Sequence, residues 1–242
     1  MRLHVAASGV RAACARGLGS AIVTALDAVL PQQCAACGRV AGAHAVLCTA
    51  CRDAIPRLSL GLCARCLADG AEPVGCRRHP HFTVWPAWVY DRRAEAVVHA
   101  LKYHGRPGVA AALGDALAAA GPPLIRADFV IDVPLHPARR RERGYNQSER
   151  LADALSATLG VARLPGALVR TRATRAQARL GAHERRRNVR GAFQVCQPAW
   201  LEGRKVLVVD DVITTGATFE ACLAALRDAG ANPVGVALAW AQ

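Results

Sequence analysis

The sequence predicts an α/β fold, a mainly parallel sheet with helices on both faces, preceded by a small cysteine-rich, metal-binding module. Three observations predict it. From Phe82 onward, short apolar runs alternate with helical patterns. An apolar strand ending in Asp210 and Asp211 leads through a hydroxyl-rich loop into a helix, and cysteine pairs crowd residues 31–80. At 242 residues and 52% hydrophobic, the chain can bury one α/β core beside that module.

A leader of residues 1–30 is expected before the module. It is Ala-rich and carries Arg2, Arg11 and Arg16, but it lacks a continuous apolar core and a cleavage site, which disfavours a secretory signal. We expect a short helix from Ser20 to Leu30. The chain has no run of about 18 apolar residues, so we expect no membrane insertion and a cytoplasmic protein.

Residues 31–80 contain four ligand pairs, each with two residues between its members. They are Cys34 and Cys37, Cys48 and Cys51, Cys63 and Cys66, and Cys76 and His79. Two thiolates at a tight turn can face one tetrahedral Zn²⁺, and two such pairs complete a closed structural site. A disulfide framework would require a secreted chain, so the residues favour a zinc module over residues 31–80.

The sequence leaves the pairing of these ligands open. Sequential use gives one site from the first four cysteines and a second from Cys63, Cys66, Cys76 and His79, but an interleaved pairing is also geometrically feasible. His79 is the weakest ligand, because Pro80 and His81 beside it are also typical of a plain loop. The remaining cysteines lie among apolar residues and are expected to be buried thiols, namely Cys14, Cys196 and Cys222.

Residues 81–242 are predicted to form the α/β domain. The expected strands, of which the last closes the sheet, are Trp85–Tyr90, Asp128–Val133, Gly191–Val195, Val206–Asp211 and Val234–Trp240. The expected helices are Arg92–Tyr103, Val109–Ala120, Gln147–Leu159 and a last one that carries Phe219 to Leu226 and ends at Gly230. Pro122 and Pro123 end the second helix. The carboxyl ends of the parallel strands then form a ligand crevice.

The segment from Val206 to Thr218 predicts a sugar-phosphate site at this crevice. Asp210 and Asp211 can accept hydrogen bonds from sugar hydroxyls or hold a Mg²⁺ shell. The loop that follows can wrap a phosphate with backbone N–H groups, because Gly216 allows close approach and the next helix presents its positive end. This loop is Thr214, Thr215, Gly216, Ala217 and Thr218. A Walker B strand begins similarly, but the chain has no G-x-x-x-x-G-K-[ST] loop.

Three further segments are predicted to reach the crevice. The run Arg143-Gly144-Tyr145-Asn146-Gln147 can offer N–H groups and an Arg fork to a pyrophosphate, although a basic turn at a helix start has the same pattern. Lys102 ends an earlier helix, where a lysine is also an ordinary partner of the helix dipole. The Arg-rich stretch Arg170–Phe193 suits either a mobile flap or a solvated loop.

Together, the cysteine pairs, Arg143 to Gln147, Thr171 to Phe193 and Val206 to Thr218 resemble the ComF family over about residues 26–242. The resemblance implies a type I phosphoribosyltransferase fold with an amino-terminal zinc finger, and 5-phosphoribosyl-1-pyrophosphate (PRPP) with Mg²⁺ as ligand. Several members are associated with competence and uptake of transforming DNA.

By position, this resemblance also implies roles for individual residues. Asp210 and Asp211 match the family's ribose acids, Thr214 to Thr218 match its 5′-phosphate loop, and Arg143 to Gln147 match its RGFNQ-like segment with Tyr145 for Phe. One position departs from the pattern, since His79 stands where relatives often have Cys.

Three functions of different classes fit these features. A PRPP-dependent transferase would release pyrophosphate to an acceptor that the sequence does not identify, with Asp210 and Asp211 stabilising positive charge on the ribose. A PRPP-sensing competence factor would bind single-stranded DNA and competence-machinery proteins without turnover. A zinc-scaffold protein would do neither.

The formal charge of +13 favours the nucleic-acid option only in part. Residues 136–190 hold 14 arginines and 4 acids, and Tyr145 is the only aromatic residue there until Phe193. The chain has 29 arginines against 2 lysines, which is typical of a coding bias. We therefore assign the local charge first to PRPP and second to a nucleic-acid backbone.

Overall fold

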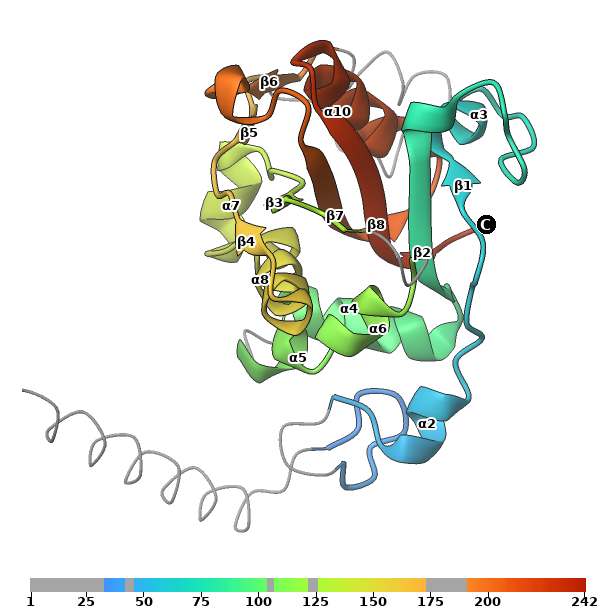
Figure 1. The fold of residues 1–242 in the computed structure, drawn as a ribbon. Helices are drawn as coiled ribbons and strands as arrows, with labels where there is room; N and C mark the ends of the chain where they lie inside the picture. The colour runs from blue at the N-terminus through green and yellow to red at the C-terminus, as the bar shows by residue number, and fades with distance from the viewer. Residues whose placement is uncertain (1–32, 42–45, 104–106, 122–125, 173–190) are drawn as a thin grey trace, which may run out of the picture.

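A computed structural model describes residues 33–41, 46–103, 107–121, 126–172 and 191–242 (Figure 1). The expected leader of residues 1–30, with its helix and Cys14, lies outside the described residues. So do residues 173–190, which make up most of the expected flap, and the proline pair that was expected to end a helix.

The centre of the molecule is a six-stranded sheet with the order β1-β2-β8-β7-β3-β4. Its strands are β1 (Leu62–Cys63), β2 (Thr83–Val89), β3 (Phe129–Asp132), β4 (Ala162–Arg163), β7 (Lys205–Ile213) and β8 (Asn232–Trp240). Every pair in it is parallel except the antiparallel pair of β1 with β2. The mainly parallel sheet is therefore confirmed, with β7 and β8 in its middle.

The expectation that the last strand closes the sheet is wrong. β8 lies between β2 and β7, where Ala237, Leu238 and Ala239 are fully buried. A run of apolar residues without alternation is typical of a central parallel strand covered on both faces. The edge beside β2 is instead occupied by β1, which comes from the cysteine-rich segment.

Helices cover both faces of the sheet, as predicted (Figure 1). One face carries α4 (Arg92–Tyr103), α5 (Pro107–Ala111), α6 (Gly114–Ala118) and α8 (Gln147–Leu159). The other carries α3 (Ala64–Ala68) and α10 (Ala217–Asp228). The alternation along β7 divides its side chains between two cores, because Leu207 and Val209 pack with the first group while Val206 and Val208 pack with the second.

The expected helix Val109–Ala120 is two helices in the structure. The chain turns at Leu113, between α5 and α6, and Gly114 then packs against α8. A Cβ at Gly114 would lie 2.4 Å from Thr158 Oγ1 and 2.8 Å from the Ala154 carbonyl oxygen. The tight packing of this glycine on α8 accounts for the break, which apolar periodicity alone does not reveal.

Two elements near the site differ from expectation. The segment after Val133 was expected to be a loop but contains α7 (Pro137–Arg143), which His136 caps at its start and Gly144 ends in a left-handed conformation. The strand expected at Gly191–Val195 in the main sheet is β6 (Phe193–Val195), which pairs antiparallel with β5 (Leu168–Arg170) in a separate two-stranded sheet. This pairing places β5 beside the mouth of the crevice.

The cysteine-rich segment is divided between the two ends of the molecule. Its first half contains α2 (Thr49–Asp53), and its second half contains β1, α3 and the 3₁₀ helix η1 (Pro80–Phe82) (Figure 1). A further 3₁₀ helix, η3 (Pro198–Trp200), precedes β7. Among helices of the described residues, none is long and apolar enough to cross a membrane.

Candidate functional site

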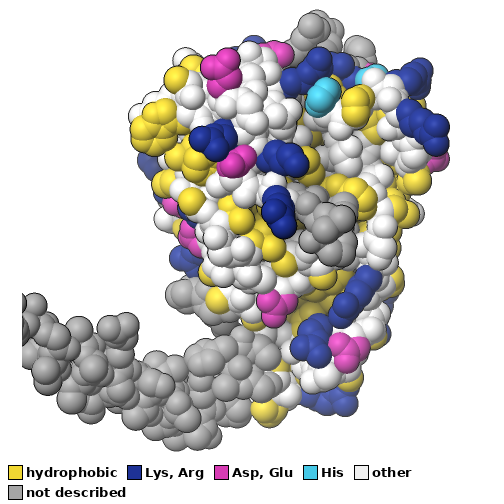
Figure 2. Space-filling view, in the orientation of Figure 1, with side chains coloured by type: hydrophobic (Ala, Val, Ile, Leu, Met, Phe, Trp, Pro, Cys, Tyr) yellow, Lys and Arg dark blue, Asp and Glu magenta, His cyan; other side chains and the backbone are white. Residues whose placement is uncertain are grey.

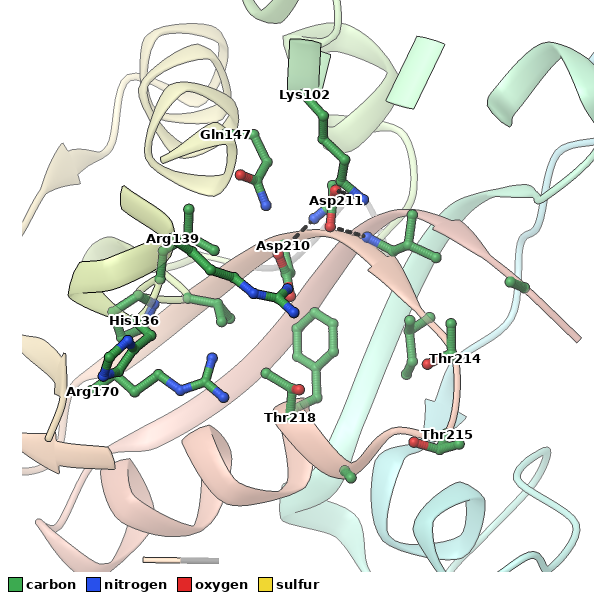
Figure 3. Close-up of a pocket in the computed structure, with 18 of the residues that line it drawn as sticks. Lys102, His136, Arg139, Gln147, Arg170, Asp210, Asp211, Thr214, Thr215 and Thr218 are labelled. Atoms are coloured by element: carbon green, nitrogen blue, oxygen red, sulfur yellow. Dashed lines mark hydrogen bonds and ion pairs between the residues drawn. The ribbon is translucent and has the colours of Figure 1, made fainter. Parts of the chain in front are cut away.

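A cavity of about 620 Å³ opens at the carboxyl ends of β3 and β7 (Figure 3). Its walls come from the end of α4, the loop between β3 and α7, α7 itself, the first turn of α8, β5, and the loop between β7 and α10. Ten of the residues predicted from the sequence line it, namely Lys102, Arg143, Gln147, Asp210, Asp211, Thr214, Thr215, Gly216, Ala217 and Thr218. The fold therefore brings most of the residues that were predicted to bind a sugar phosphate together around one cavity.

Two predicted residues lie outside this cavity. Gly144 and Asn146 line a neighbouring depression of about 580 Å³ instead. Asn146 is buried and caps α8, because its Oδ1 accepts from the Ser148 N–H at 3.2 Å and its Nδ2 donates to Asp132 Oδ2 at 2.8 Å. The contacts of both residues fix the backbone around the cavity, and a direct role for them in substrate binding stays a prediction.

Tyr145, the one aromatic side chain that was expected to be available for base stacking, is engaged within the protein. Its hydroxyl donates to the Leu101 carbonyl oxygen, and the guanidinium of Arg150 lies 4.0 Å above its ring. Both ends of the side chain are thus occupied, so Tyr145 ties the start of α8 to α4.

The two acids at the end of β7 have different environments. Asp210 Oδ1 accepts from Ser148 Oγ at 2.6 Å and from the Asp211 N–H at 2.9 Å. Burial, and then the neighbouring charge of Asp211, raise the pKa of Asp210 to about 7. Asp211 is almost fully buried, and its Oδ2 lies 2.7 Å from Lys102 Nζ (Figure 3). Asp211 thus keeps a cationic partner, whereas Asp210 is poised to exchange a proton near neutral pH.

These acids fit a magnesium ion. Carboxylate oxygens are the ligands that Mg²⁺ prefers, usually one or two of them together with phosphate oxygens. Among the described residues, the buried Asp211 Oδ2 makes only its ion pair with the Lys102 ammonium. A positive charge is thus already accommodated at this oxygen.

The loop between β7 and α10 turns at Gly216, which has a left-handed φ of 71° and stands at the N-cap of α10. The sequence suggested that this glycine makes room for a phosphate. The structure gives another reason, because a Cβ at Gly216 would lie 2.5 Å from the Ala64 carbonyl oxygen and 2.9 Å from Leu67 Cβ. The glycine is therefore required by the close packing of the loop on α3.

Arginines line the side of the cavity opposite Lys102 (Figure 3). Arg139 and Arg143 come from α7, and Arg143 Nη1 donates to Gln147 Oε1 at 3.1 Å. Arg170 comes from β5, and burial lowers the pKa of its guanidinium. Arg170 is the first residue of the Arg-rich stretch that was predicted to reach the crevice. Sequence reasoning missed Ser148 as a site residue, because no local pattern indicates that the second residue of α8 reaches β7.

The metal ligands form two clusters. The ligand atoms of Cys34, Cys37, Cys48 and Cys51 lie within 4.8 Å of one another, and so do those of Cys63, Cys66, Cys76 and His79. His79 Nδ1 is 3.5 Å from the sulfurs of Cys66 and Cys76. The pairing is therefore sequential and His79 belongs to the second cluster. Four thiolates, or three thiolates and an imidazole, are typical donor sets of structural zinc.

The other cysteines meet the expectation of burial only in part. Cys222 is fully buried on α10, but Cys196 is half-buried next to β6. Neither belongs to a metal cluster among the described residues.

Comparison with known proteins agrees with this architecture. Residues 131–242 match the phosphoribosyl transferase domain family, and residues 25–78 match the double zinc ribbon domain family. The α/β body is a type I phosphoribosyltransferase domain, and the cysteine-rich segment is a double zinc ribbon.

Relatives extend over most of the chain. DNA utilization protein YhgH of Salmonella typhimurium is 33% identical over 192 residues, which cover 72% of this chain and 81% of that protein. The protein of the same name in Escherichia coli (strain K12) is 33% identical over 192 residues, covering 76% and 79%. Competence protein F of Haemophilus influenzae is 37% identical over 110 residues, which cover 45% of this chain and 48% of that protein.

Proposed function

We propose, since this chain belongs to the ComF family of DNA utilization protein YhgH and Competence protein F, that its cavity binds PRPP together with Mg²⁺. The observation that carries the proposal is the convergence of two acids, a hydroxyl-rich loop and arginines on one cavity. A sugar that bears a phosphate at one end and a pyrophosphate at the other has complementary chemistry.

Each wall suits one part of this ligand. Thr215 and Thr218, with the first N–H groups of α10, suit the 5′-phosphate. Asp210 and Asp211 suit the ribose hydroxyls and would hold Mg²⁺, which supplies positive charge to the pyrophosphate oxygens when bound. Arg139 and Arg170 suit the pyrophosphate, because guanidinium groups bind phosphate oxygens through paired N–H donors.

The same arrangement suits transfer of the phosphoribosyl group. When the bond from the ribose C1 carbon to pyrophosphate breaks, positive charge develops on the ring while the acceptor forms the new bond. Asp210 and Asp211 would stabilise that charge, and the arginines would retain the departing pyrophosphate. The alternative is a PRPP sensor that binds the ligand without turnover. The residues of the cavity do not identify the acceptor of a transferase.

We also propose a cytoplasmic location, because the metal-binding thiols of the ribbon stay reduced there.

Calorimetric titration with PRPP, in the presence and absence of Mg²⁺, tests binding. The double variant Asp210→Asn with Asp211→Asn should keep its fold and lose Mg²⁺-dependent affinity by about a hundredfold, roughly 3 kcal/mol. Unchanged affinity in this variant would place the ligand elsewhere. Release of pyrophosphate with a panel of nucleobase and amine acceptors then separates a transferase from a sensor.

A second candidate function is binding of single-stranded DNA. The relatives named above are called a DNA utilization protein and a competence protein. In this chain, α7 carries four arginines and no buried residue, and its Arg140 and Arg141 line the depression beside the cavity. On the face shown in Figure 2, basic side chains lie in separate groups rather than in one continuous patch. The four arginines of α7 make this helix the local candidate for a phosphate contact.

The salt dependence of DNA binding tests this candidate. Affinity for a single strand should fall with salt by a slope of about −0.7 per phosphate neutralised. Arg140→Ala with Arg141→Ala should flatten the slope by about one unit and leave PRPP affinity intact, because both residues lie outside the PRPP cavity. Residues 173–190 belong to the same arginine-rich stretch of residues 136–190, but they lie outside the described residues. A slope that the α7 variant leaves unchanged would exclude this helix as the contact.

A further inference from the structure

The loop between β7 and α10 rests on α3, which carries two ligands of the second metal cluster, one at its start and one in its middle. Cys63 is the N-cap of α3 and accepts from the Cys66 N–H, while Cys66 lies within α3. The residue between these two ligands that touches the loop is Ala64, whose carbonyl oxygen faces Gly216. The metal ligands therefore flank the atom that packs against the loop.

A second connection runs from α3 to the first turn of α10. Arg65 Nε lies 3.2 Å from Glu220 Oε1, and the Arg65 side chain is only about one-third exposed while that of Glu220 is 11% exposed. Glu220 stands four residues after Gly216, and its N–H donates to the Gly216 carbonyl oxygen at 2.8 Å. Displacement of α3 would thus remove a partly buried ion pair at the start of α10.

A third connection runs through the other end of the cluster. His79 is the N-cap of η1, and its carbonyl oxygen accepts from the Phe82 N–H at 3.1 Å. The buried Phe82 lies under the Arg65 guanidinium, 4.4 Å from it, and η1 also contacts α10. Both arms of the second cluster, α3 and η1, therefore converge on the helix that begins with the loop.

The first cluster has no such connection within the described residues. Its buried ligands, Cys34 and Cys51, pack with the core on the other face of the sheet, among residues of α4, α6 and α8. In Figure 1, α2 lies at the opposite end of the molecule from α3 and α10. None of its ligands lines the cavity at the end of β7.

We propose that the second metal cluster is the support of the phosphate loop. Ala64, Arg65 and Leu67 are its positioning residues, and metal bound by Cys63, Cys66, Cys76 and His79 sets the conformation of Thr214 to Thr218. Metal loss there opens the loop, whereas metal loss from the first cluster leaves it unchanged. The consequence for PRPP affinity rests on the proposed function, but the effect on the loop does not.

Two ligand variants, each tested in the full chain, separate the clusters. Elemental analysis of the parent should give about two Zn²⁺ per chain, and each variant should retain about one. Cys76→Ser removes a ligand of the second cluster that lies outside α3, and Cys37→Ser is the matched change in the first. Hydrogen exchange at the amides of Thr215 to Thr218 should accelerate about tenfold or more in Cys76→Ser and stay at the parent rate in Cys37→Ser.

PRPP affinity gives the second measurement, expected to fall about tenfold in Cys76→Ser and to be unchanged in Cys37→Ser. If Cys76→Ser does not fold, Arg65→Met serves instead, since it keeps both clusters and should accelerate exchange at the same amides. Parent-like loop exchange in the folded second-cluster variant, or in Arg65→Met, would overturn the proposal. A parent that fails to bind PRPP while loop exchange responds as expected would refute the proposed function alone.

Discussion

The two halves of the cavity are held in place by different forces. In the acidic half, Asp210, Asp211, Lys102 and Ser148 are arranged by charge and by short hydrogen bonds. In the phosphate-loop half, Gly216 is arranged by contact of backbone atoms with α3. We therefore expect pH and cations to affect the acidic half, and steric change or metal removal to affect the loop half.

The largest effect is expected in the loop half, from Gly216→Ala. The new Cβ would lie 2.5 Å from the Ala64 carbonyl oxygen at a φ of +71°, so either the loop or α3 must move. The left-handed conformation and the collision together should cost about 3–4 kcal/mol of unfolding free energy and lower PRPP affinity about a hundredfold. Denaturant unfolding and calorimetry measure the two quantities.

Gly203→Ala is the matched control for this change. Gly203 has the same φ of +71°, but a Cβ there would meet nothing within 4 Å. It should cost only about 1 kcal/mol and leave PRPP affinity unchanged. Equal effects of the two substitutions would show that backbone strain, rather than contact with α3, is the reason why the loop requires a glycine at position 216.

In the acidic half, Asp210→Asn should stabilise the protein at alkaline pH. Burial raises the pKa of Asp210 to about 7, above its value in the unfolded chain, so the carboxyl favours the folded state when protonated. That contribution is present at pH 4 and is lost as the pH rises through about 7. The free energy of unfolding of the variant should therefore exceed that of the parent by about 2–3 kcal/mol at pH 8 and match it at pH 4. Thermal unfolding at both pH values checks this, and a difference independent of pH would contradict it.

A smaller effect is expected from Lys102→Met, which leaves the buried Asp211 carboxylate without its cation. The free energy of unfolding should fall by about 2 kcal/mol. The loss is limited because the lysine is partly exposed, so that water can solvate the carboxylate in its place. Mg²⁺ should restore more stability to this variant than to the parent, as measured by the melting temperature. Lys205→Met changes the only other lysine, at the exposed start of β7, and should respond to Mg²⁺ as the parent does.

The smallest effect is expected between the two halves, on α7. Arg139 lines the cavity and Arg141 lines the depression on its other side. Arg139→Ala should weaken PRPP binding about tenfold, or roughly 1.4 kcal/mol, and Arg141→Ala should leave it unchanged. Equal losses in both variants would indicate a general electrostatic attraction rather than a defined contact.

The sequence predicts the acidic half of the site better than its support. Helices α4 and α8 begin and end where their patterns predict, because apolar spacing and caps are local signals. The strand before Asp210 and the ligand spacing of the ribbon are local in the same way. The fold could be predicted to this extent from short segments alone.

The rest depends on contacts between distant residues. Helix α7 has no buried residue and hence no apolar period, although Pro137 and Gly144 mark its ends. Arg170 reaches the cavity only because β5 pairs with β6. The partner of Gly216 is Ala64, far earlier in the chain, and no pattern in the loop indicates that contact.

The place of β8 has a consequence for how the protein is made. Among the strands that the structure describes, β2 pairs in parallel with β8 alone, and β8 also joins β2 to β7. A ribosome delivers β2 long before β8, so the sheet stays in two separate parts until late in synthesis. During that interval β1 and the second cluster have only β2 of this sheet to pack against. Insertion of the last strand is therefore the step that joins this part of the ribbon, through the sheet, to β7 and to the cavity at its end.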